Sequence, residues 1–291
     1  VWKQSSKDFH VTDTKVSTED KAVLLQATYL LAAGNLYVVT YKIYPSGIVH
    51  VNAKFTSTDM QAAETEVSEA TRMATFTPGS DAARKAASKL EVPRIGVRFR
   101  LPAQMNNVQY FGRGPEENYI DRNHGTMVGI YQTTADKMYF NYVRPQENGH
   151  HTDTRWLNLS PDKGNGLVIV ADSLIGFNAL RNSVEDFDSE EALPHPYQWN
   201  NFSPEEATNH DEKAARNVLR RMHHVNDITP RDFVEVCVDM KQQGVGGYDS
   251  WGARPEPFHQ IPANREYNWG FTLVPVRSGS QATEAAKYDY R

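Results

Sequence analysis

The sequence predicts an all-β fold built mainly of antiparallel strands, with helix in under about a fifth of the chain. Apolar and polar residues alternate with a period of two in segments spread along nearly the whole chain. Clusters of Gly, Pro, Asn and Asp separate these segments, as is typical of tight turns. Long stretches with the 3.6-residue period of a helix are rare, and the chain shows neither a repeat nor an internal linker. We therefore predict one domain over 1–277 and a polar tail over 278–291.

The N-terminal part predicts a meander of strands. Alternation begins near Phe9 and resumes near Val23. Longer runs rich in β-branched and aromatic residues, which favour strands, follow over 36–44 and 48–55. The Pro-Ser-Gly sequence at 45–47 supplies the turn between these two runs.

The rest of the chain adds strands, two weak helical segments and one long loop. Further strands are predicted at 92–101, 108–111, 167–171, 233–240 and 268–276. Residues 81–89 contain good helix formers but little apolar face, so they predict a surface insertion. One or two helical turns are predicted at 214–219, and the prolines and acids of 183–211 indicate an enlarged loop.

Composition limits the classes of partner. The 291 residues are 39% hydrophobic and 23% charged with a net charge of −5, so neither a nucleic acid nor a membrane partner is expected. No apolar run has the length of a transmembrane helix. Cys237 is the only cysteine, which excludes an intrachain disulfide. The N-terminus has neither a signal-peptide pattern nor an initiator Met, so it predicts a cut inside a longer chain and no particular localisation.

A glycine-rich segment over 244–252 is the best candidate for a binding loop. Its four glycines allow backbone conformations that other residues avoid, and it follows the strand predicted at 233–240. The loop therefore presents Trp251 from a rigid element. A flat indole with one N–H donor suits stacking on a sugar ring, but it could equally fill a gap between this domain and a neighbour. The loop by itself leaves both interpretations open.

Four motifs follow one another along the chain. They are Pro93-Arg94-Ile95-Gly96; Gly112-x-Gly114-Pro115-x-Glu117-Asn118-Tyr119-x-Asp121-Arg122; Pro145-x-Glu147-Asn148-Gly149 with Thr154-Arg155; and Gly244-x-Gly246-Gly247-x-Asp249-Ser250-Trp251. In this order they closely resemble the C-terminal "small chain" domain of β-galactosidases of glycoside hydrolase family 2. The Trp-Arg-Ala-Pro-Thr-Asp-Asn-Asp segment that opens this domain in the family is absent. That absence fits a trimmed fragment better than the natural small subunit of a two-subunit enzyme.

The resemblance implies a fold and indicates which domain of the enzyme carries the catalytic residues. The fold would be a large antiparallel β-supersandwich, similar to that of the galactose mutarotases. In the family, two glutamates in a separate (β/α)8 barrel hydrolyse the galactoside with retention of configuration, and nothing in this chain resembles that barrel. We therefore expect no catalytic residue and no cofactor in this chain, while Mg²⁺ is used elsewhere in such enzymes.

The same resemblance identifies the partners and one site residue. Trp251 matches the loop tryptophan that the family contributes to the sugar site, with Asp249 and Ser250 in the supporting loop. The expected partners are the remaining domains of the parent glycosidase, above all its catalytic barrel, and a galactoside substrate.

Two alternatives remain open. Mutarotase-like epimerisation would need acid and base groups on the sheet, and the candidates are Glu147, His150, His151 and Asp153. Adjacent histidines on a strand point to opposite faces, so at most one of them lines a given surface. A stand-alone carbohydrate-binding module would instead use stacking faces from Tyr110, Trp156, Trp199, Trp251 and Trp269.

The remaining polar residues are expected to be structural. His195 and the pair His223-His224 lack a third ligand at a metal-binding spacing, so no metal site is predicted. Four residues of the second motif are predicted to hold a turn by hydrogen bonds and ion pairs: Glu117, Asn118, Asp121 and Arg122. Arg113 is predicted to pair with Glu117 or Glu147. The same prediction applies to Arg155.

Overall fold

The computed structural model describes residues 2–5, 8–31, 34–57, 91–187, 193–194, 219–220, 225–246 and 254–290. Within this part of the chain, eleven strands form one antiparallel sheet with the order β1-β2-β3-β4-β13-β9-β8-β6-β7, and β12 pairs with both β9 and β5. Two further short strands, β10 (Leu193–Pro194) and β11 (Leu219–Arg220), pair with each other. The predicted all-β, antiparallel class is confirmed.

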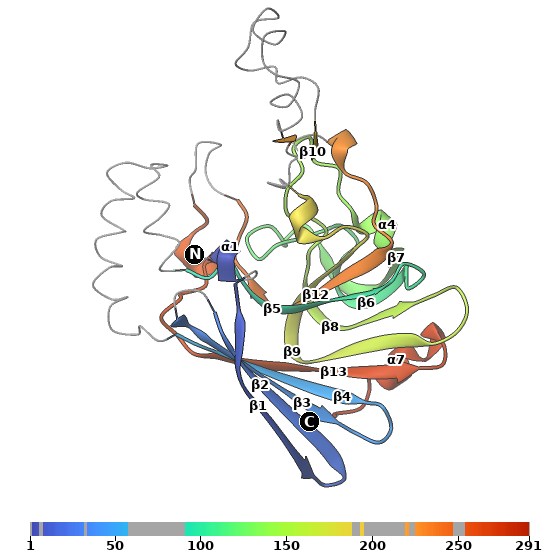
Figure 1. Ribbon diagram of the computed structural model, residues 1–291. Helices are drawn as coiled ribbons and strands as arrows, with labels where there is room; N and C mark the ends of the chain where they lie inside the picture. Colours follow the sequence, from blue (N-terminus) through green and yellow to red (C-terminus); the bar gives the residue numbers. More distant parts are fainter. Residues whose placement is uncertain are drawn as a thin grey trace, which may run out of the picture.

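The predicted N-terminal meander is also confirmed. It consists of β1 (His10–Glu19), β2 (Ala22–Leu30), β3 (Leu36–Ile43) and β4 (Val49–Thr56), each paired with the next. The C-terminal strand β13 (Tyr267–Val276) joins the free edge of β4, so the two ends of the chain share one layer (Figure 1).

The second layer contains β5 (Arg94–Pro102), β6 (Asn107–Gly114), β7 (Met127–Thr134), β8 (His151–Ser160) and β12 (Phe233–Gln242). The long strand β9 (Gly166–Leu180) connects the layers, because residues 166–171 pair with β13 and residues 176–180 pair with β12. The sheet thereby folds over on itself into a sandwich (Figure 1).

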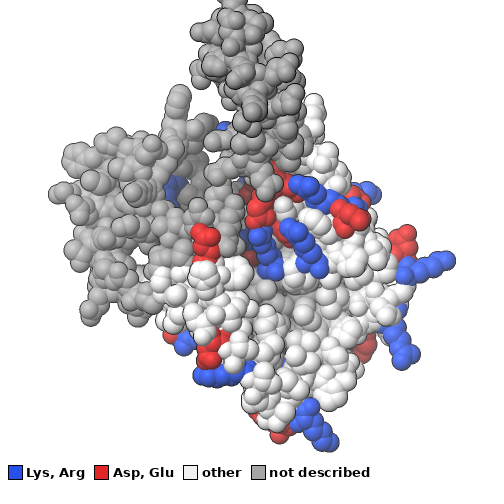
Figure 2. Space-filling view, viewed as in Figure 1, with Lys and Arg blue, Asp and Glu red and all other residues white. Residues whose placement is uncertain are grey.

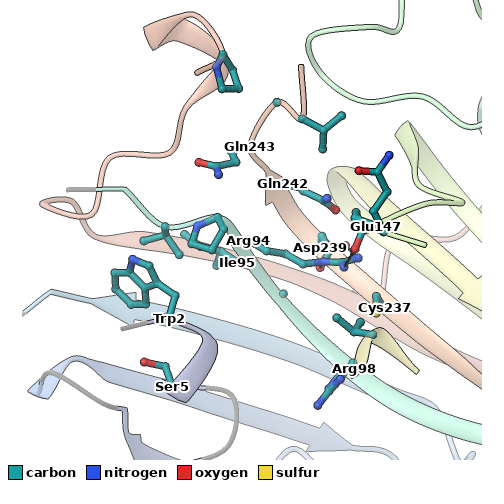
Figure 3. Close-up of a pocket in the computed structure, with 18 of the residues that line it drawn as sticks. Trp2, Ser5, Arg94, Ile95, Arg98, Glu147, Cys237, Asp239, Gln242 and Gln243 are labelled. Carbon is teal, nitrogen blue, oxygen red and sulfur yellow. Dashed lines mark hydrogen bonds and ion pairs between the residues drawn. The ribbon is translucent and has the colours of Figure 1, made fainter. Parts of the chain in front are cut away.

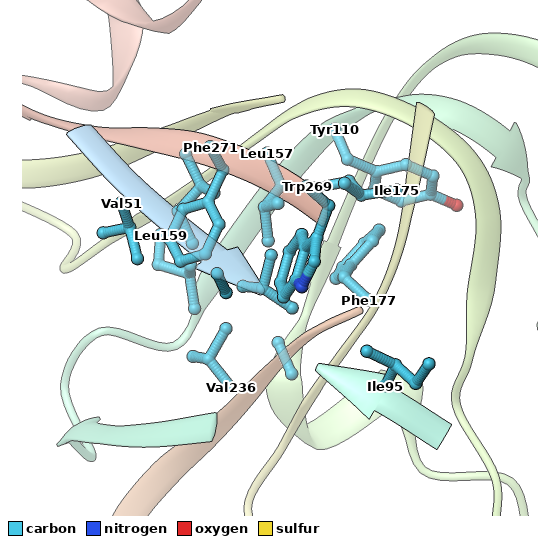
Figure 4. Packing of buried hydrophobic residues seen from close by; sticks show 14 of the residues in the cluster. Val51, Ile95, Tyr110, Leu157, Leu159, Ile175, Phe177, Val236, Trp269 and Phe271 are labelled. Carbon is cyan, nitrogen blue, oxygen red and sulfur yellow. The ribbon is translucent and has the colours of Figure 1, made fainter. Parts of the chain in front are cut away.

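The main core lies between these layers. Val51, Trp269 and Phe271 from β4 and β13 face Ile95 and Val236 from β5 and β12 (Figure 4). Leu157, Ile169, Phe177 and Tyr110 belong to the same cluster, and each of these four is fully buried. Inward-facing positions alternate along β4 and β6, as a half-buried strand requires.

Helix is limited to short pieces in the described part of the chain. These are α1 (Trp2–Ser5), α4 (Ala135–Met138), α7 (Ala282–Ala285) and the 3-10 turns η2 (Val184–Asp186), η3 (Val225–Asp227), η4 (Pro257–His259) and η5 (Gly279–Gln281). Among the described residues, we found no helix with the length and apolarity needed to traverse a lipid bilayer. The helical segment expected at 81–89 and most of the loop expected at 183–211 lie outside the described residues. Of the helical turns expected at 214–219, only Leu219 is described, and it begins strand β11 instead.

The predicted polar tail, 278–291, begins with η5 and α7. Ala282 of α7 is fully buried, and it packs with Trp156, Val168, Val274 and Val276 in a second, smaller apolar cluster. This part of the tail is therefore packed against the sheet.

Candidate functional site

A cavity of about 960 Å³ opens at one end of the sandwich, between α1, β5 and the end of β12 (Figure 3). Its apolar lining includes Trp2, Tyr37, Phe55, Ile95 and Val245. Its polar lining includes Arg94, Arg98, Arg122, Glu147, Asp239 and Gln242. An apolar cavity with a few converging polar groups is the usual form of a ligand site.

The floor of the cavity is a buried network centred on Arg94. The Arg94 guanidinium donates to both carboxylate oxygens of Asp239, at 2.8 and 2.5 Å, and to Asn178 Oδ1 at 2.5 Å. The Asn178 amide donates to Glu147 Oε1 at 2.9 Å, and Glu147 Oε2 lies 3.4 Å from Arg94. Although burial opposes the charged form, the Asp239 carboxylate holds the pKa of Arg94 above its ordinary value. Arg94 and Asp239 therefore form a buried, charged pair.

The arginines that line the cavity are balanced by carboxylates. Arg98 pairs with Glu185 at 2.6 Å. Arg122 pairs with Glu117, and Arg254 pairs with Glu91. Basic and acidic side chains likewise lie next to each other on the described part of the face in Figure 2. Such a lining offers hydrogen-bonding groups without a strong field of one sign, which suits a neutral polar ligand.

Of the four sugar-face candidates, only Glu147 lines this cavity. His150 is 1% exposed, stacks on Tyr119 and lies 2.9 Å from Asn178 Oδ1 through its Nδ1. The Asn178 amide nitrogen is already donating to Glu147 and to the Asn148 carbonyl, so its oxygen accepts and His150 Nδ1 carries a proton. Burial, reinforced by the charge of Arg94, lowers the pKa of His150 to about 3. His150 is therefore a neutral structural group.

His151 is buried as well, on the other side of the strand. Its ring contacts Tyr110 and Phe177, and its two nitrogens lie 3.1 Å from the Gly149 carbonyl and 3.3 Å from the Pro115 carbonyl. Burial lowers the pKa of His151. Neither histidine is among the residues described around the cavity.

The ion pairs of Arg113 and Arg155 differ from the prediction. Arg113 donates to Asp153 Oδ2 at 2.5 Å, not to Glu117 or Glu147. Arg155 donates to the Asp153 main-chain carbonyl and lies over the Phe111 ring. Asp153 has a positive φ of 52° and sits where the register of β8 shifts against β9. The irregular backbone turns this carboxylate towards Arg113, and a period-two pattern cannot predict such a local change of direction.

The turn predicted in the second motif is confirmed for Glu117, Asn118 and Arg122, whereas Asp121 bonds to a distant segment. Glu117 accepts hydrogen bonds from Arg122, from the Tyr142 hydroxyl and from the Gly149 main-chain N–H. Asn118 accepts from the main-chain N–H of Thr152 at 2.9 Å. These contacts join the second motif to the third.

The first residues of the glycine-rich loop border the same cavity. The Gly244 N–H donates to the His259 carbonyl at 2.8 Å, and the Gly246 N–H donates to Asp121 Oδ2 at 2.7 Å. The predicted site residues Asp249, Ser250 and Trp251 lie outside the described residues, so their role stays a prediction. Sequence reasoning did not single out Asp239 or Asn178. A signal for Asp239 was present in the sequence. Glu235 and Asp239 are two acidic residues on the same face of a strand whose other residues between 233 and 240 are apolar.

The described residues hold no group of three or more His, Cys, Asp or Glu side chains arranged to bind a metal ion. His195, His223 and His224 lie outside them. The predicted absence of a metal site therefore stays a prediction for the chain as a whole.

The fold and the cavity define a class of protein: a large antiparallel β-sandwich domain with a charge-balanced cavity that the first residues of a glycine-rich segment border. The family described as "Beta galactosidase small chain" matches residues 1–273, and the chain belongs to this family. The predicted membership is thus confirmed.

Individual relatives agree with this membership. The chain is 28% identical over 278 residues to a β-galactosidase of Priestia megaterium, covering 95% of this chain and 21% of the relative. It is 26% identical over 280 residues to a β-galactosidase of Streptococcus thermophilus, covering 94% of this chain and 21% of the relative. A third β-galactosidase, from an Arthrobacter species, is 40% identical over 123 residues, which cover 40% of this chain and 12% of the relative. The chain therefore spans about a fifth of the length of the first two.

Proposed function

We propose that this chain is the C-terminal domain of a retaining β-galactosidase, that it supports the catalytic barrel, and that Trp251 forms an aromatic wall of the galactoside site. The parent enzyme would cleave terminal β-galactosides through a covalent glycosyl intermediate formed on a barrel glutamate. In this proposal the chain contributes part of the galactoside-binding surface, and the catalytic carboxylates belong to the barrel.

The anchored base of the loop is the observation that carries the proposal. Gly244 and Gly246 are bonded to separate segments of the domain, and both border the cavity. The segment that leads to Trp251 is thereby fixed at the cavity rim as far as Gly246. We propose that the Trp251 indole stacks on the apolar face of a galactose ring.

The epimerase alternative receives little support from the geometry. General acid–base catalysis needs groups within hydrogen-bond reach of one sugar oxygen. His150 and His151 are buried, and burial lowers the pKa of both side chains, which favours their neutral form at physiological pH. Asp153 is engaged by Arg113, which leaves Glu147 as the only one of the four candidates beside the cavity.

The proposal is tested by replacing Trp251 with Ala. In the full-length enzyme we expect galactoside binding to weaken by about 1–2 kcal/mol, the scale of a lost aromatic contact and its buried area. In the 291-residue chain the same change should alter the free energy of unfolding by no more than about 0.5 kcal/mol, as for a surface substitution. Galactoside affinity and urea denaturation measure the two effects.

Trp269→Ala is the matched control. Trp269 is 5% exposed, belongs to the main core and donates from Nε1 to the Tyr37 hydroxyl at 3.3 Å. Its truncation should cost about 3–5 kcal/mol of stability. A loss of that size for Trp251→Ala would instead assign Trp251 to core packing and refute its proposed role.

A further inference from the structure

We propose that Asp121 is a positioning residue that fixes the start of the glycine-rich loop, at Gly244 and Gly246, and that it acts on galactoside binding through this loop. The anchoring role rests only on contacts within the described residues. Its consequence for galactoside binding rests on the proposed function of Trp251.

The contact joins two motifs that lie far apart in the sequence. Asp121 belongs to the second motif and Gly246 to the fourth, and the Gly246 N–H donates to Asp121 Oδ2 at 2.7 Å. A hydrogen bond from an N–H to a carboxylate is charge-assisted and stronger than one between neutral groups. Gly246 is solvent-exposed, so the surrounding core does not hold it in place.

The close approach of the two segments explains a glycine at position 244. A Cβ atom on Gly244 would lie 2.6 Å from both Cγ and Oδ2 of Asp121, nearer than real Cβ contacts come. The Asp121 carboxylate thus packs directly against the loop backbone at Gly244 while it accepts the hydrogen bond from Gly246. One side chain fixes both the distance and the direction of the loop base.

Asp121 is itself held by rigid structure. The turn closes through a hydrogen bond of 2.8 Å from the Arg122 N–H to the Tyr119 carbonyl, and Tyr119 is 1% exposed. The Asn118 N–H donates to the His150 carbonyl at 2.7 Å, which ties the turn to the buried start of β8. The loop base is therefore connected to the core through Asp121, and the remaining anchors at 243 and 244 are main-chain bonds to Pro93 and His259.

The anchoring role is tested in the 291-residue chain by amide hydrogen exchange. In Asp121→Ala, exchange of the Gly246 amide should accelerate about tenfold or more, the factor expected for losing a hydrogen bond to a charged group. Asp121→Asn keeps one acceptor oxygen and should retain part of the protection. Asp162→Ala is the control, because the exposed Asp162 accepts a side-chain hydrogen bond from Asn107 in a different turn. Unchanged Gly246 exchange in Asp121→Ala would overturn the proposal.

The functional consequence is tested in the full-length enzyme by a double-mutant cycle with Trp251→Ala. Asp121→Ala should raise KM for an aryl galactoside several-fold with a smaller change in kcat, and Asp121→Asn should restore most of the loss. In the Trp251→Ala background, Asp121→Ala should change KM less than twofold, because the residue it positions is gone. Independent, multiplicative effects would contradict positioning through Trp251.

The two arms separate failure of this inference from failure of the proposed function. If Trp251→Ala leaves KM unchanged, the proposed role of Trp251 fails, and the hydrogen-exchange result still decides whether Asp121 anchors the loop. If Trp251→Ala raises KM but the Gly246 amide exchanges at the same rate in Asp121→Ala as in the parent chain, the proposed function stands and the anchoring role fails.

Discussion

At the residue scale, the polar groups around Arg94 beneath the cavity are paired with one another. Asn178 receives hydrogen bonds on its oxygen from Arg94 and His150 and donates from its nitrogen to Glu147. Arg94 is thereby surrounded by acceptors, which offsets the cost of burying its charge. The network makes the floor of the cavity rigid and leaves Glu147 as its partly exposed carboxylate.

His150 should make the stability of the domain sensitive to mild acid. Its pKa is about 3 in the folded chain, against about 6.5 in the unfolded chain, so below pH 6.5 the unfolded state takes up a proton that the folded state does not. The contribution of neutral His150 to the free energy of unfolding is fully present above pH 6.5 and is lost as the pH falls towards 3. We expect His150 alone to account for a loss of about 1–2 kcal/mol between pH 6.5 and 5.

Urea denaturation of the 291-residue chain at several pH values measures this effect. His151 adds in the same direction, because burial lowers its pKa too. In His150→Gln the free energy of unfolding should change less between pH 6.5 and 5, by the amount that His150 contributes in the parent chain. This difference does not depend on the absolute stability of the variant. Equal pH dependence in the two proteins would show that His150 is not a buried neutral histidine.

At the element scale, an edge strand and an outer face of the sheet are protected differently. Strand β1 is exposed along its whole length and carries Asp13, Lys15 and Glu19, charges that discourage pairing with another chain. The outer face of β13 and β9 is instead covered by α7, which buries Ala282 over the second apolar cluster. A short C-terminal element therefore completes a part of the sandwich that would otherwise be exposed.

Ala282→Glu tests the contribution of α7. A glutamate at this fully buried position would have to displace packed neighbours or leave an unpaired charge in an apolar site. We expect a loss of about 2–4 kcal/mol in the free energy of unfolding. The adjacent, exposed Thr283→Glu is the control and should stay within about 0.5 kcal/mol of the parent chain. Similar, small effects for both variants would mean that α7 does not pack on the sheet in solution.

At the scale of the whole molecule, the chain is a family member that spans about a fifth of the length of relatives such as the Priestia megaterium enzyme. We expect the 291-residue chain on its own to release no nitrophenol from an aryl β-galactoside. Retaining hydrolysis needs a nucleophile and an acid about 5–5.5 Å apart across a bound sugar, and we assign both to another domain. Assay of highly purified chain measures this, with the full-length enzyme as positive control. Sustained activity that disappears on replacing Glu147 with Gln would contradict the assignment.

Part of the fold was predictable because its signal is local. Strands β3, β4, β12 and β13 show period-two alternation and β-branched residues, and each was predicted within a few residues of its ends. Strand β7 lies at an edge and is mostly exposed, so its residues carry a weak pattern. Strand β8 is buried on both faces and includes polar residues, which hides its alternation.

The sequence by itself determined the all-β class and, through four motifs in a fixed order, the family. It also indicated that Glu117 and Arg122 hold a turn, because the bond between these two side chains joins near neighbours in the sequence. Only the tertiary structure decided which distant residues meet: Arg94 with Asp239, Arg113 with Asp153, and Asp121 with Gly246. The physical reason is that alternation specifies which face of a strand a side chain occupies, whereas the neighbour across that face depends on strand order and on local bulges.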